Sequence, residues 1–75
     1  MTYEIKELKT GSMIEIIDLA TSNPKQFQLE MVKRAVCQDG QPLGDAVLEL
    51  PFGEYMELAV QVMEKHNFGG EAKKS

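Results

Sequence analysis

Apolar residues recur with helical spacing over three stretches of the chain, and the last stretch shows the pattern most clearly. Its apolar positions lie three or four residues apart, as they do on one face of an α-helix. They are Tyr55, Leu58, Ala59, Val62 and Met63, and His66 lies at the rim of the same stripe. The positions between them are mostly charged or polar. With two similar stretches upstream, this pattern predicts helices near residues 12–21, 24–37 and 52–67.

Capping residues indicate where the predicted helices begin and end. Ser12 and Glu15 fit the S-x-x-E capping box at the start of the first helix. Asn23 can cap the second helix, and Pro24 suits its first position, where no N–H is needed. We expect Gly40 to end this second helix rather than to form a hairpin turn with the aspartate before it.

Two short stretches have less regular patterns. TYEIKEL, residues 2–8, alternates between apolar and polar side chains, as a short β-strand does. Residues 45–50 fit either one helical turn capped by Asp45 or a strand that pairs with TYEIKEL, and the helical turn is favoured. The sequence therefore predicts a mainly α, three-helix domain over residues 1–68, with the N-terminal strand left open and a short helical turn before the last helix. Residues 69–75 have no large apolar side chain, so we expect a disordered C-terminal tail.

The length and charge of the chain restrict its class. A single domain of 75 residues has a small core, and one cysteine permits neither an internal disulfide nor a zinc cluster. Self-association is the remaining common route to stability, so we expect a homo-oligomer. The net charge of −4 argues against nucleic acid as a partner. The apolar runs are too short to span a membrane, no signal peptide is recognisable, and a free cysteine suits the cytoplasm.

Residues that could perform catalysis are few. Cys37 and His66 could form a nucleophile–base pair, but no third group that would orient the histidine accompanies them. Cys37 is more simply explained as a small apolar residue at a helix end. The carboxylate pairs Glu15/Asp18 and Glu54/Glu57 are typical of solvated helix faces. We expect neither an enzyme nor a bound cofactor or metal ion.

The order of the motifs resembles that of small phage tail assembly chaperones. The resemblance covers residues 3–68. Its parts are YEIKEL followed by TG, then NPKQFQLEMVKRAV, then DG with PL two residues on, and finally LELPFGEYMELAVQVMEKHNF. Proteins of this family coat the long tape measure protein in the host cytoplasm and recruit tail tube subunits. The resemblance thus implies a non-catalytic chaperone whose partners are the tape measure and tail tube proteins.

The expected mode of binding is an apolar helix of the partner lying in a groove. The candidate contact residues are Phe27, Met31, Tyr55, Met56 and Met63. Tail assembly chaperones are also made as two products by ribosomal frameshifting, and the codons of Ala72-Lys73-Lys74 could supply the slippery run. The rival hypotheses are a generic small acidic bacterial interaction module or regulator, and a small enzyme that uses Cys37.

Overall fold

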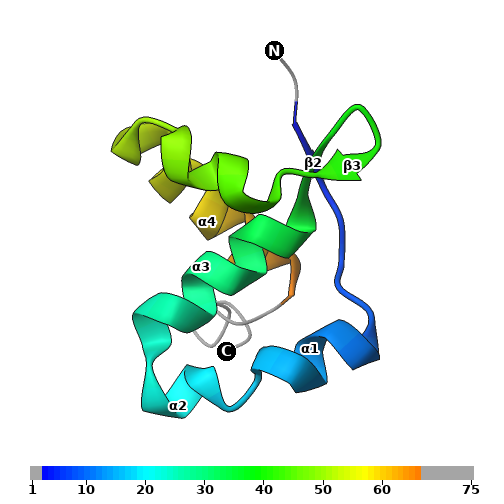
Figure 1. The fold of residues 1–75 in the computed structure, drawn as a ribbon, viewed down its shortest axis with the longest axis vertical. Coiled ribbons are helices and arrows are strands. Elements are labelled where there is room, and N and C mark those ends of the chain that lie inside the picture. Colours follow the sequence, from blue (N-terminus) through cyan, green and yellow to red (C-terminus); the bar gives the residue numbers. More distant parts are fainter. Residues whose placement is uncertain (1–2, 67–75) are drawn as a thin grey trace.

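The computed structural model describes residues 3–66, and over this range the domain is mainly helical, as predicted. Its elements are β1 (Glu4–Ile5), α1 (Thr10–Ile16), α2 (Leu19–Ser22), α3 (Pro24–Ala35), β2 (Val36–Gln38), β3 (Gln41–Pro42), the 3₁₀ helix η1 (Gly44–Glu49) and α4 (Phe52–Lys65). Figure 1 shows α3 crossing the middle of the molecule, with α1 and α2 along one side and η1 and α4 on the other. No helix in this range is both long and apolar enough to cross a membrane.

The central helix α3 organises the core, because it packs against α2, α4 and η1. Its start is as predicted: the Asn23 side chain accepts a hydrogen bond from the Gln26 N–H at 3.3 Å, and Pro24 takes the first helical position. Met31 and Val32 of α3 are fully buried against Val62 of α4 and Val36 of β2. Among the described residues, no polar or charged side chain is buried, so the core is held by apolar packing alone.

A small antiparallel sheet in the order β1-β2-β3 closes one end of the domain. Ile5 of β1 lies opposite Val36 of β2, and Gln38 lies opposite Gln41 across a tight turn. Asp39 and Gly40 form this turn with positive φ angles of 57° and 83°, as a two-residue hairpin requires. The prediction that Gly40 ends a helix is therefore wrong. Helix α3 ends at Ala35 because the next residues pair with β1, which also confirms the N-terminal strand.

The first predicted helix, 12–21, is also corrected. It begins at Thr10, so Ser12 lies inside it, and its N-cap residue Lys9 makes no side-chain capping bond. The chain then breaks after Ile16, and α2 resumes at Leu19 in a direction that lets it pack against α3.

The remaining predictions for the fold concern the second half of the chain. The helical turn predicted for residues 45–50 is confirmed as η1, which precedes α4. Helix α4 matches its predicted range closely and ends at Lys65. The predicted tail, residues 69–75, lies outside the described residues.

Candidate functional site

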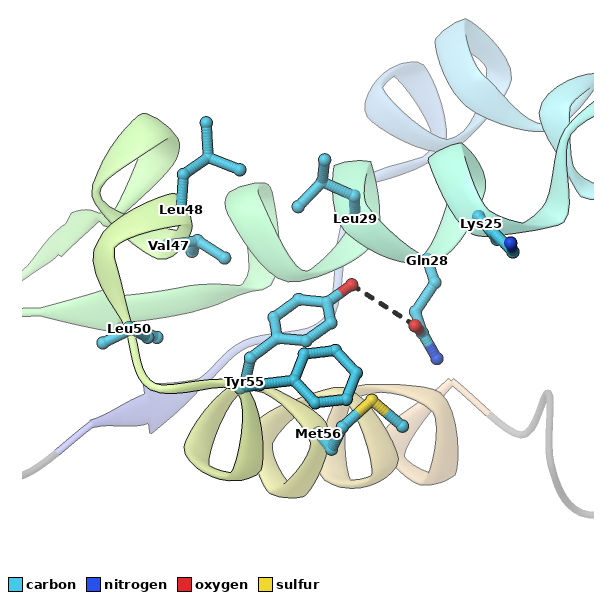
Figure 2. Close-up of a pocket in the computed structure, with 9 residues that line it drawn as sticks. Lys25, Gln28, Leu29, Val47, Leu48, Leu50, Tyr55 and Met56 are labelled. Carbon is cyan, nitrogen blue, oxygen red and sulfur yellow. Dashed lines mark hydrogen bonds between the residues drawn. The ribbon is translucent and has the colours of Figure 1, made fainter.

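An open apolar groove of about 580 Å³ lies between α3, η1 and α4, and we call it the α3–α4 groove (Figure 2). It is lined by Lys25, Gln28, Leu29, Val47, Leu48, Leu50, Phe52, Tyr55 and Met56. Apolar side chains thus form most of its surface. A groove of this size is in the range of roughly 300–1,000 Å³ that binding sites for small molecules occupy.

Helix α4 contributes one side of the groove because apolar residues occupy more of its circumference than the core buries. Leu58 and Val62 face inward and are buried. Phe52, Met56 and Val60 follow one another at intervals of four residues, and they stay 74%, 37% and 51% exposed. Residues four apart lie on the same side of a helix, so these three form a row of apolar side chains along α4. Phe52 and Met56 of this row line the groove.

The opposite wall comes from η1 and α3. Leu48 of η1 is 60% exposed, whereas Val47, its neighbour, is buried and anchors η1 to the core. Pro51 then separates η1 from α4, and the turn at this point brings Leu48 and Phe52 to the same groove. Leu29 contributes from α3 and is half-buried. The groove therefore combines three elements, and it forms only when the domain is folded.

One hydrogen bond crosses the groove from α4 to α3. The Tyr55 hydroxyl donates to the Gln28 side-chain oxygen at 3.3 Å, shown by the dashed line in Figure 2. Burial raises the pKa of Tyr55 above its ordinary value, since the charged phenolate is poorly solvated there. The Phe52 ring lies near the Tyr55 ring, with a centroid distance of 6.1 Å and an interplanar angle of 31°. The bond ties the two walls together at the level of the aromatic side chains.

The five predicted contact residues have different positions. Tyr55 and Met56 line the groove, whereas Met63 is half-buried against the core. Phe27 and Met31 are core residues, with 6% and 0% of their surfaces exposed, and neither lines the groove. They lie on the face of α3 that the rest of the domain covers.

Sequence reasoning missed two of the most exposed groove residues, Leu48 and Phe52. A signal for Phe52 was present in the spacing of four residues from Phe52 through Met56 to Val60. For Leu48 no comparable signal exists, because its exposure depends on how η1 packs.

The two residues considered for catalysis interact with backbone groups. The Leu8 N–H donates to Nε2 of His66 at 2.8 Å, so Nδ1 carries the proton and donates to the Val62 carbonyl, also at 2.8 Å. Cys37 lies in β2 rather than at a helix end, and its buried Sγ is 3.8 Å from the Ala35 carbonyl oxygen. The Nε2 bond thus joins the end of α4 to the segment that precedes α1, and the Nδ1 bond holds the imidazole ring against α4 itself.

Two carboxylates, those of Glu15 and Asp45, form ion pairs that link other elements to α3. Glu15 of α1 forms an ion pair with Arg34 of α3 at 2.8 Å, and Asp45 of η1 pairs with Lys33 of α3 at 3.0 Å. These contacts raise the pKa of Lys33 and of Arg34, because the hydrogen-bonded carboxylates favour the charged forms. Within residues 3–66, no group of three or more His, Cys, Asp or Glu residues is arranged to hold a metal ion.

Comparisons of the chain with protein-family models, with curated proteins and with solved structures gave no match.

Proposed function

We propose that the chain is a non-catalytic phage tail assembly chaperone whose α3–α4 groove binds apolar helical segments of the tape measure protein. In this role it also recruits tail tube subunits and acts as a homo-oligomer. The observation that carries the proposal is the exposure of Leu48, Phe52 and Met56 around one groove. The resemblance of residues 3–68 to tail assembly chaperones gives the proposal its particular partner.

The exposed apolar side chains around one groove indicate a binding site for a partner. Scattered exposed apolar residues are normal on protein surfaces, but contiguous ones commonly mark an interaction site. Burying a side chain such as Phe52 or Leu48 under a partner contributes about 1.5–3 kcal/mol. The amphipathic helix of a partner can fill such a groove with side chains spaced three or four residues apart. Met56 adds a flexible side chain that adapts to partners of different shape.

The length of the groove favours many copies on a long partner. Its α3 wall runs from Lys25 to Leu29, which is about one helical turn, with a rise of roughly 6 Å. A single domain can therefore hold one or two turns of a partner helix. A long helical protein with an apolar stripe would need a row of domains to cover it. A generic regulator, by contrast, would bind one partner in a fixed ratio.

Co-expression with the tape measure protein tests the proposal. The gene beside that of this chain should encode a long helical tape measure protein, and the chain should keep that protein in the soluble fraction at many copies per molecule. Met56→Asp should abolish this effect. Gln61→Asp is the matched control, because it adds the same charge to an exposed position of α4 outside the groove.

Three outcomes would count against the proposal. One is equal solubilisation by the Met56→Asp and Gln61→Asp proteins when both remain folded, which would separate the activity from the groove. Another is a complex of one chain with one partner, which favours the generic regulator. The third is a gene neighbourhood without a tape measure gene.

A further inference from the structure

The α3–α4 groove has one charged residue in its lining, Lys25, and no acidic one. Lys25 lies in the first turn of α3 and is exposed, at the end of the groove away from η1 (Figure 2). Within residues 3–66 it forms no ion pair. An apolar groove with a single cation at its open end is complementary to an apolar segment that carries a negative charge at one end.

The other two basic residues of α3, Lys33 and Arg34, lie in its last turn and form ion pairs within the domain. Lys33 lies 3.0 Å from a carboxylate oxygen of Asp45 and 3.8 Å from one of Glu30. Arg34 lies 2.8 Å from Glu15 and 3.5 Å from Glu30. These ion pairs therefore link η1 and α1 to α3. Lys25 does not do so, although the chain has twelve acidic residues against eight basic ones.

We infer that the groove preferentially binds amphipathic helices that carry a carboxylate about one turn beyond their apolar contact residues. Lys25 is the residue that forms an ion pair with this carboxylate. The inference rests on the proposed function, because it assumes that a partner helix occupies the groove. Lys25 and Leu29 are four residues apart on α3, so their Cα atoms differ by roughly 6 Å along the helix axis. A side chain that packs on Leu29 and an acidic one that reaches Lys25 would have a similar separation on the partner helix.

Synthetic helical peptides of this design serve as the probe. All carry the same leucines at every third and fourth position, and they differ at one residue in the first or the last turn, which is Glu, Gln or Lys. Their dissociation constants for the full chain are measured by fluorescence anisotropy at low and at high salt. With the variable residue in either the first or the last turn, one of the two Glu peptides should bind about 1.5- to 5-fold more tightly than the matching Gln peptide. This is the gain in affinity expected from one exposed ion pair. High salt should reduce this preference.

Variants at Lys25 assign the preference to this residue. Lys25→Gln should remove it, and Lys25→Glu should reverse it so that the Lys peptide binds best. Lys9→Glu is the matched control: it gives the protein the same net charge as Lys25→Glu, but Lys9 lies at the start of α1, outside the groove lining. The Lys9→Glu protein should keep the preference of the unchanged protein for Glu.

The outcomes separate this inference from the proposed function. Equal binding of the Glu, Gln and Lys peptides would overturn the inference alone, because the groove would still hold an apolar helix. The inference would also be overturned if Lys25→Glu left the order of the peptide affinities unchanged. It would likewise be overturned if Lys9→Glu changed that order as much as Lys25→Glu does. Failure of every peptide to bind would contradict both the inference and the groove as the binding site.

Discussion

Replacement of Leu58 by aspartate should unfold the domain. Leu58 lies on the inner face of α4 with 6% of its surface exposed, packed in the main core cluster. Loss of a buried leucine side chain costs about 2–5 kcal/mol through lost transfer energy and the cavity left behind. A carboxylate at this position adds several kcal/mol, because a buried charge needs a partner. No polar side chain is buried among the described residues, so the core offers it none.

The total stability available to the domain is small by comparison. A domain of fewer than about 80 residues without disulfides or metals rarely gains more than about 3–5 kcal/mol from its core. The cost of Leu58→Asp therefore equals or exceeds the free energy of unfolding. Far-UV circular dichroism at neutral pH should show the loss of helix, and the thermal transition of the native protein should disappear.

Glu57→Ala is the control for this experiment, since Glu57 is the exposed neighbour of Leu58 on α4. A surface substitution of this kind changes the free energy of unfolding by about 0.5 kcal/mol or less. If Leu58→Asp melted at the same temperature as Glu57→Ala, the assignment of this side of α4 to the core would be wrong. Retained helix without a cooperative melt would instead indicate a collapsed state with lost packing.

Three further predictions address association, pH and the gene. The exposed apolar row on α4 predicts self-association at high concentration, and sedimentation should show a smaller oligomer for Met56→Asp; a protein that stays monomeric at millimolar concentration would contradict this. Stability should fall as the pH rises above 10, because the folded pKa of Tyr55 is raised from 10.0 and the unfolded chain therefore loses this proton first; urea titrations across this range test it, and a flat profile would refute it. The chaperone proposal predicts that Lys73 and Lys74 are encoded by an A-rich slippery run followed by an open frame in the −1 register, and the gene sequence decides this.

The elements with strong local signals could be predicted from the sequence. The start of α3 follows from Asn23 and Pro24, whose effects act within one helical turn. The apolar spacing in α4 is likewise a local property. For these segments, packing and local preference agree, so neighbouring residues are enough to identify them.

The elements that depend on distant residues could not be predicted in the same way. Asp39-Gly40 is compatible with a helix end and with a hairpin turn, and the choice depends on whether Val36 finds a strand to pair with. That strand contains Ile5, which is far away in the sequence. The break after Ile16 is similar, because it depends on how α2 packs against α3.

The groove residues show the limit of periodicity as a guide to function. Met31 and Met56 are both candidate contact residues by residue type, but the sequence could not indicate how deep each would lie. Met31 is fully buried because α3 is surrounded by other elements, whereas Met56 is 37% exposed beside the groove. Burial is a property of the assembled domain, so candidate contact residues chosen by residue type include core residues.

The two apolar sides of α4 separate folding from binding. Successive residues of an α-helix are about 100° apart around its axis, so Leu58 and Met56 point about 160° away from each other. A helix that only had to cover this core would be polar at Met56, and the same holds for Phe52 and Val60 in its row. These three side chains stay exposed in a domain whose small core has little stability to spare. The expected contrast between Leu58→Asp, which unfolds the chain, and Met56→Asp, which leaves it folded but unable to bind, follows from this division of one helix.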